Sequence, residues 1–122
     1  RFKLSKNIFL MGYKKNIFRY INKSAGLICS SLWEEPGFVI QEAAACKKII
    51  LTSDCYTGPS EFLNYGKSGY VFKSNDEKSF IKNFCKLLKE KKYHKKKISD
   101  NFKKTKLYTS NFFISEINKI LS

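Results

Sequence analysis

The chain has 122 residues, enough for one domain built around one core. Its net charge of +14 would suit a partner made of nucleic acid or anionic lipid, but 61 of the 122 residues are Lys, Ile, Asn, Phe or Tyr, a bias expected from an A/T-rich genome. Four cysteines without a C-x-x-C pair and a single histidine argue against a zinc site, and neither a signal peptide nor a membrane-spanning apolar run is present in the sequence.

Only residues 89–97 form a true lysine cluster. We interpret this cluster as a solvated helix face and turn, with an anionic membrane surface as the alternative. Cys29 and Cys46 lie in apolar patterns and are expected to be small buried side chains in a reducing compartment. We therefore expect a cytoplasmic protein, with peripheral contact to the inner face of an anionic membrane as the alternative.

Short apolar runs alternate with helical patterns in the first part of the chain. The runs predicted as strands are residues 7–11 (NIFLM), 26–30 (GLICS), 48–52 (KIILT) and 68–73 (SGYVFK), the last nearer an edge of the sheet. The predicted helices are residues 15–24 and 36–47, and a short helix begins at Pro59. This alternation predicts an α/β fold with a parallel, doubly wound, Rossmann-like sheet.

From residue 75 onward the pattern is helical only. Asn75-Asp76 can cap a helix whose apolar face carries Phe80, Ile81, Phe84 and Leu87-Leu88. A second helix is predicted over residues 93–105, and a last one begins at Ser110 with Phe113, Ile114, Ile117 and Leu121 in phase.

Residues 30–46 (SSLWEEPGFVIQEAAAC) carry two glutamates, Glu34 and Glu42, on either side of a Pro-Gly entry into a helix. Ligands of open α/β sheets bind beyond the carboxyl ends of the strands, where the first turn of the next helix offers unpaired N–H groups to an anion. Here those donors would be Gly37, Phe38 and Val39, and glycine lets a phosphate approach closely. Glu42 is four residues after Phe38, on the same side of the predicted helix as Ala43 and Cys46. We therefore expect it not to be a solvated surface charge, and its carboxylate to need a partner.

The spacing Glu34-x7-Glu42, with PGFV inside it and AAAC after it, resembles the E-x7-E signature of retaining glycosyltransferases of the GT-B fold. This is the family of glycosyl transferase group 1, or family 4, whose members use nucleotide-diphosphate sugars. Residues 48–53 (KIILTS), Asp54, Gly58-Pro59, Glu61, Gly66 and Gly69 also follow the order of that family. The resemblance covers residues 7–88, and it departs at Lys47, where the family usually has the glycine that ends the helix.

The resemblance implies a role for each residue of the motif. Glu34 would be the catalytic carboxylate and would contact hydroxyls of the donor sugar, while the amides of Gly37, Phe38 and Val39 would bind the diphosphate. The ring of Phe38 is expected to lie in the core. Glu42 would accept the two ribose hydroxyls, and the turn at Gly12 and Tyr13 would lie near the nucleotide base. For Asp54, Gly58, Pro59 and Glu61 we expect loop architecture rather than chemistry.

The same resemblance implies that residues 1–122 are the carboxyl-terminal, donor-binding domain of a longer two-domain enzyme, with residues 75–122 as its helical part. Such an enzyme would transfer a hexose or N-acetylhexosamine from a nucleotide-diphosphate sugar, expected to be a UDP-sugar, to a glycan or glycolipid acceptor, as in surface polysaccharide biosynthesis. No cofactor and no metal are expected. The family's upstream Arg and Lys for the diphosphate, and its acceptor domain, would lie before Arg1, so this chain alone is expected to bind nucleotide weakly and to catalyse nothing.

A different functional class remains as the alternative: a noncatalytic basic α/β module that binds nucleic acid or an anionic membrane. A salt-dependent affinity for RNA or acidic lipid that survives Glu42→Ala would favour it. The aromatic residues do not interleave with basic ones as in a strand-stacking platform, so the leading hypothesis includes no nucleic-acid partner.

Overall fold

The structure, a computed structural model, describes residues 6–35 and 37–121, without the side chains of residues 113, 116, 120 and 121. Its elements, in chain order, are α1 (Phe18–Lys23), β1 (Gly26–Cys29), α2 (Phe38–Ala45), β2 (Ile49–Ser53), α3 (Pro59–Phe62), β3 (Tyr70–Phe72), α4 (Glu77–Lys89), α5 (Lys91–Thr105), the 3-10 turn η1 (Lys106–Tyr108) and α6 (Ser110–Leu121). Within these residues no helix is long and apolar enough to cross a membrane.

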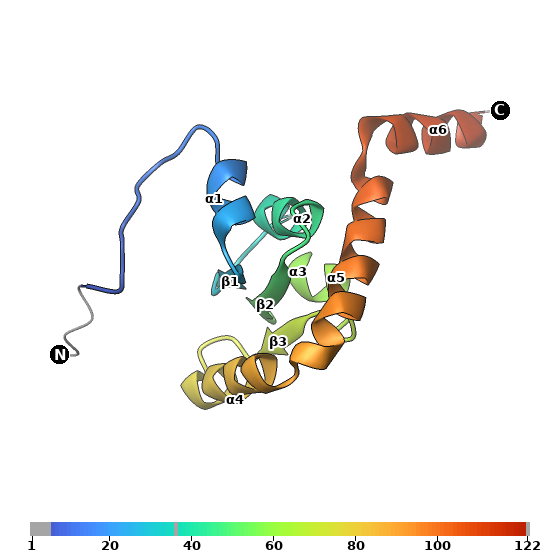
Figure 1. Cartoon of the computed structure of the whole chain (residues 1–122). Coiled ribbons are helices and arrows are strands. Elements are labelled where there is room, and N and C mark those ends of the chain that lie inside the picture. Colours follow the sequence, from blue (N-terminus) through green and yellow to red (C-terminus); the bar gives the residue numbers. More distant parts are fainter. Residues whose placement is uncertain (1–5, 36, 122) are drawn as a thin grey trace.

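The three strands form one parallel sheet in the order β1-β2-β3. Gly26 pairs with Ile49 and Leu51 pairs with Tyr70, so β2 is the central strand and all five of its residues are buried. Parallel neighbours require crossover connections, which α2 and α3 supply (Figure 1). The predicted α/β fold with a parallel sheet is confirmed, β3 is an edge strand of the described sheet as predicted, and the arrangement is consistent with part of a GT-B carboxyl-terminal domain.

Helices cover both faces of the sheet (Figure 1). Successive residues of a strand point to opposite faces, so Ile50 packs with α1, α2 and α3, whereas Ile49 and Leu51 pack with α4 and α5. The first core is Ile21, Cys29, Ile40, Ala43, Ala44, Ile50, Phe62 and Leu63. The second combines Ile49, Leu51, Tyr70 and Phe72 with the half-buried Phe80, Phe84, Leu87 and Ile98. The sheet is therefore doubly wound, and its carboxyl edge stays open to solvent at the loops.

The helical part of the chain begins and ends close to the predicted positions. Asp76 caps α4, since its Oδ1 accepts a hydrogen bond from the Ser79 amide at 2.9 Å. Helix α5 begins two residues earlier than predicted, because Glu90 serves as the end of α4 and the start of α5. Helix α6 begins at Ser110, although the hydroxyl that accepts from its first turn is that of Thr109.

The prediction of a strand at residues 7–11 is wrong. In the structure residues 8–14 have no regular secondary structure and lie away from the sheet (Figure 1), and Phe9 and Leu10 are 75% and 96% exposed. A strand is stable only beside another strand that pairs with its backbone groups, and none of the described strands lies next to this run. The predicted helix over residues 15–24 is shorter for a related reason: only Ile21 of α1 is buried.

Candidate functional site

Two loops at the carboxyl ends of β1 and β2 form the candidate site. The first comprises the described residues 30–35 and 37, and the second is residues 54–58. They are joined by a parallel bridge between Trp33 and Tyr56 and by a hydrogen bond from the Thr57 hydroxyl to the Glu34 carbonyl at 2.8 Å. At their base the Ser53 hydroxyl donates to the Ser31 carbonyl. These links hold the backbone around Glu34 in one position.

Glu34 is half-buried, and its carboxylate is held at one oxygen only. Oε1 accepts a hydrogen bond from the Ser31 hydroxyl at 2.6 Å and a weaker one from the Cys29 thiol at 3.7 Å. Oε2 has no hydrogen bond with any described residue. A fixed carboxylate with one free oxygen is suited to accept a hydroxyl of a ligand.

Gly37 sits at the start of α2 in the left-handed region, with φ of 72°. A Cβ at this position would lie 3.3 Å from Cγ of Pro59, so both the backbone conformation and the packing against α3 favour glycine. No side chain caps α2, and the amides of Phe38 and Val39 donate to no described group. The first turn of α2 therefore keeps donors that an anion could use.

The predicted position of the Phe38 ring in the core is wrong, because the ring is 66% exposed. The buried stripe of α2 is Ile40, Ala43 and Ala44, and Phe38 lies on another side of the helix. That side also carries Glu42, four residues later, and both line a groove of about 320 Å³ between α1, α2 and the end of α5. The remaining lining residues are Phe18, Gln41, Ala45, Thr105 and Tyr108.

Glu42 is half-buried in this groove, and its carboxylate makes no hydrogen bond or ion pair with a described residue. The partner that we expected is therefore absent from the described part of the chain. The arrangement leaves both carboxylate oxygens available to a ligand in the groove.

Asp54 and Gly58 of the second loop make structural contacts. Asp54 accepts a hydrogen bond from the Ser74 amide at 2.6 Å, and this bond lowers the pKa of its carboxyl below the ordinary value. Gly58 precedes α3 with φ of 89°, and its carbonyl accepts a hydrogen bond from the amide of Phe62, the last residue of that helix. Burial raises the pKa of the Cys55 thiol, which makes that thiol a poor nucleophile.

Gly12 and Tyr13 lie apart from these groups, in the exposed segment that precedes α1 (Figure 1). Tyr13 is 92% exposed, and a side chain at Gly12 would meet no atom within 4 Å. The structure therefore does not bring the predicted base-binding residues into contact with Glu34 or Glu42.

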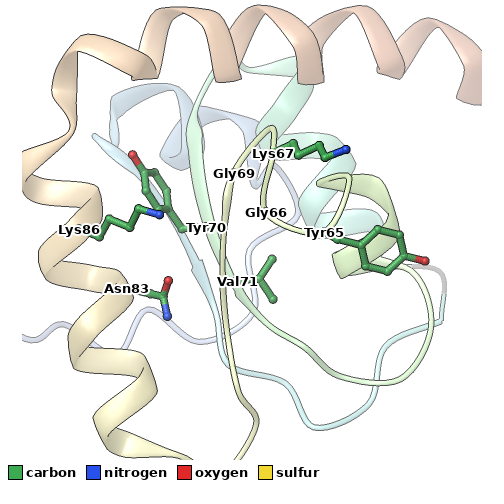
Figure 2. Close-up of a pocket in the computed structure, with 8 residues that line it drawn as sticks. All are labelled: Tyr65, Gly66, Lys67, Gly69, Tyr70, Val71, Asn83 and Lys86. Atoms are coloured by element: carbon green, nitrogen blue, oxygen red, sulfur yellow. The ribbon is translucent and has the colours of Figure 1, made fainter.

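A pocket of about 320 Å³ on another part of the molecule contains none of the predicted site residues. Figure 2 shows it beside β3, with Asn83 and Lys86 of α4 directed toward the strand and Tyr65 directed away from it. Tyr70 in this pocket donates to Glu90 at 3.3 Å. These contacts join α4 to the sheet, and we assign the pocket a structural role.

Sequence reasoning missed Ser31 and Thr57, which hold the side chain and the backbone of Glu34. Ser31 could have been found from its position three residues before Glu34 at a strand end, where a hydroxyl can reach a carboxylate. Thr57 could not, because its contact joins two loops that are distant in sequence.

The comparisons with known proteins agree with this fold. Residues 1–105 match the family described as Glycosyl transferases group 1. An uncharacterized glycosyltransferase of Methanocaldococcus jannaschii is 37% identical over 60 residues, 49% of this chain and 15% of that protein. A poly(ribitol-phosphate) alpha-N-acetylglucosaminyltransferase of Staphylococcus aureus is 27% identical over 73 residues, 60% of this chain and 15% of that protein. The alignments thus span about 15% of the length of either relative. Since the family match includes most of the chain, the protein belongs to the group 1 glycosyltransferases.

Proposed function

We propose that the chain is the donor-binding part of a retaining glycosyltransferase with two domains. The enzyme transfers a hexose or N-acetylhexosamine from a nucleotide-diphosphate sugar, with UDP as the nucleotide, to a glycan or glycolipid acceptor in the synthesis of a surface polysaccharide. Membership of the family supports glycosyl transfer as the reaction. The Staphylococcus aureus relative is named as an N-acetylglucosaminyltransferase, which supports an N-acetylhexosamine as the transferred sugar.

The observation that carries this proposal is the state of Glu34. The carboxylate stands at the carboxyl end of β1, is fixed by Ser31 at Oε1 and keeps Oε2 free. In the proposed complex Oε2 accepts a hydroxyl of the donor sugar, and the negative charge stabilises the positive charge that develops on the sugar ring as the bond to the diphosphate breaks.

The beginning of α2 and the groove beside it supply the remaining contacts. The amides of Gly37, Phe38 and Val39 bind the diphosphate, and the partial positive charge of the helix terminus stabilises it as it leaves. Glu42 accepts the two ribose hydroxyls, which suit a carboxylate with two unpaired oxygens. This arrangement needs no metal and no cofactor, because hydrogen-bond donors of the chain replace the cation.

The test is an NMR titration of the labelled 122-residue chain with UDP, GDP and ADP. We expect peak movements at residues 37–39 and at Glu42 with UDP, and weak binding, because further groups for the diphosphate would come from outside this sequence. Movement of the Gly12 and Tyr13 peaks would in addition place the base near that turn.

Two variants sharpen the titration. Glu42→Ala should abolish the movements, whereas Glu61→Ala, an exposed carboxylate on α3, should leave them unchanged. If no nucleotide moves any peak of the folded chain, or if both variants behave alike, the proposed donor site is wrong. Sugar transfer by this chain alone would contradict the two-domain proposal.

A further inference from the structure

Two aromatic side chains stand exposed on the loops that hold Glu34. Trp33 and Tyr56 are 65% and 73% exposed, and their ring centroids lie 6.0 Å apart with the ring planes tilted by 31°. Two neighbouring exposed rings beside Glu34 offer an apolar surface to a ligand. Trp33 and Tyr56 thus form an aromatic pair on the two loops.

The backbone that carries the aromatic pair is held by contacts between the two loops. Its two residues form the bridge between the loops, and Thr57 fixes the second loop by donating to the Glu34 carbonyl. Thr57 is β-branched and has φ of 63°, a conformation that such residues rarely adopt, so the surrounding contacts must impose it. A pre-organised backbone lowers the entropic cost of placing the two rings against a ligand.

The charge of the two loops indicates what kind of ligand fits. Residues 30–37 and 54–58 contain three acidic residues, Glu34, Glu35 and Asp54, and no Lys, Arg or His. The carboxylates among them offer acceptors to hydroxyl groups of a ligand. An uncharged sugar ring combines such hydroxyls with a face of C–H groups, and that face packs well on aromatic rings.

We propose that the aromatic pair binds a sugar ring of the acceptor glycan. This inference rests on the proposed function and deepens it, since the donor contacts come from Glu34, α2 and its groove, whereas the aromatic pair is a separate surface on the same loops. Trp33 and Tyr56 thereby position the acceptor beside the donor sugar at Glu34.

Trp33 is the only tryptophan of the chain, so its fluorescence reports on this surface alone. The experiment titrates the 122-residue chain with chitotriose, maltotriose and cellotriose, and separately with UDP. We expect a quench or blue shift of the Trp33 emission that saturates with at least one trisaccharide and does not occur with UDP.

The variants are Tyr56→Ala and, as the matched control, Tyr65→Ala, which removes another exposed tyrosine from a different loop. Tyr56→Ala should weaken the response roughly fivefold, and Tyr65→Ala should leave it unchanged. Circular dichroism checks that each variant is folded, and if Tyr56→Ala unfolds, Tyr56→Phe takes its place and should retain the response.

Three outcomes overturn the inference: no response to any trisaccharide, a response to UDP alone, or equal loss in both alanine variants. These outcomes are separable from failure of the donor site, because the NMR titration with UDP follows residues 37–42 and does not depend on Trp33. Nucleotide binding without a sugar response would reject the aromatic pair and keep the donor site.

Discussion

Lys47 occupies a position at which glycine is the usual residue. It follows α2 with φ of 56°, and the Lys47 and Lys48 amides donate to the Ala44 and Ala43 carbonyls, the hydrogen-bond pattern of a Schellman motif. A left-handed residue with a Cβ costs about 1–2 kcal/mol. The lysine recovers part of this, since its Nζ lies 4.6 Å from the centroid of the Phe102 ring, a contact of about 0.5–1 kcal/mol.

We therefore expect Lys47→Gly to raise the free energy of unfolding by about 0.5–1 kcal/mol in urea denaturation. The matched variant is Lys47→Ala, which keeps the strained backbone and loses the contact with Phe102, so it should lower stability by roughly the same amount. Equal effects of the two substitutions would show that the backbone conformation is not the cause.

Tyr70 gives a prediction for alkaline pH. Burial, followed by the nearby charge of Glu90, raises the pKa of its phenol from 10.0 to about 12. A raised pKa stabilises the folded state below pH 10, and this contribution is lost as the pH rises toward 12. Tyr70→Phe should flatten this decrease in stability against pH relative to the unchanged chain. Ultraviolet titration of the phenols should contain one late step that is missing in the variant.

The candidate site shows which residues can be predicted from sequence. Glu34, Gly37 and Glu42 stand in one continuous motif, so their place at a strand end and on the following helix could be predicted from local patterns. The position of the Phe38 ring could not, because Ile40, Ala43 and Ala44 alone are enough to bury α2. Whether the Phe38 ring is buried depends on what packs against α2 and not on the sequence of the helix itself.

Helix α5 carries polar side chains on the side that contacts the segment between α3 and β3. Lys97 donates to the carbonyls of Gly66, Lys67 and Gly69, Asn101 donates to that of Ser68 at 2.7 Å, and Lys104 donates to that of Phe62. The amides of Gly66, Lys67 and Ser68 bond to carbonyls within the segment between α3 and β3, and the side chains of α5 supply donors to the carbonyls at its end. Burial also lowers the pKa of the Lys97 ammonium group.

Asn101 is fully buried, and we expect Asn101→Ala to destabilise the chain by about 2 kcal/mol, because it leaves the Ser68 carbonyl unpaired and opens a small cavity. Lys103→Ala is the matched control, since Lys103 lies on the exposed face of the same helix, and its effect should stay within about 0.5 kcal/mol. Urea denaturation measures both. A small effect of Asn101→Ala would mean that water replaces the amide.

The elements that were predicted correctly are marked by features of their own local sequence. Short apolar runs, the Asp76 cap and the proline of α3 are local signals: the runs at residues 26–30 and 48–52 coincide with strands, and the cap and the proline coincide with helix starts. Residues 7–11 carry an equally apolar pattern, yet they form no strand, because strand formation depends on a neighbour in space. Sequence alone therefore predicted the type of fold better than it predicted which runs join the sheet.

At the scale of the whole molecule, the net charge and the free side of β1 have opposite effects on association between chains. Among the described strands β1 pairs only with β2, and beside it lies an apolar groove of about 560 Å³ that includes Ile28, Phe84 and Leu88. An uncovered edge and groove favour association between chains. The net charge of +14 opposes this, since the chains repel one another until salt screens the charge.

We therefore expect the chain to be monomeric at about 0.05 M salt and to associate at about 0.5 M, as measured by sedimentation velocity. Ile28→Lys places a charge in the groove and should suppress the association at high salt. Leu10→Lys adds the same charge at a side chain that is 96% exposed and does not line the groove, so it should change the association little. If both variants suppress association equally, net charge alone governs it; if salt has no effect, the free side of β1 is not adhesive.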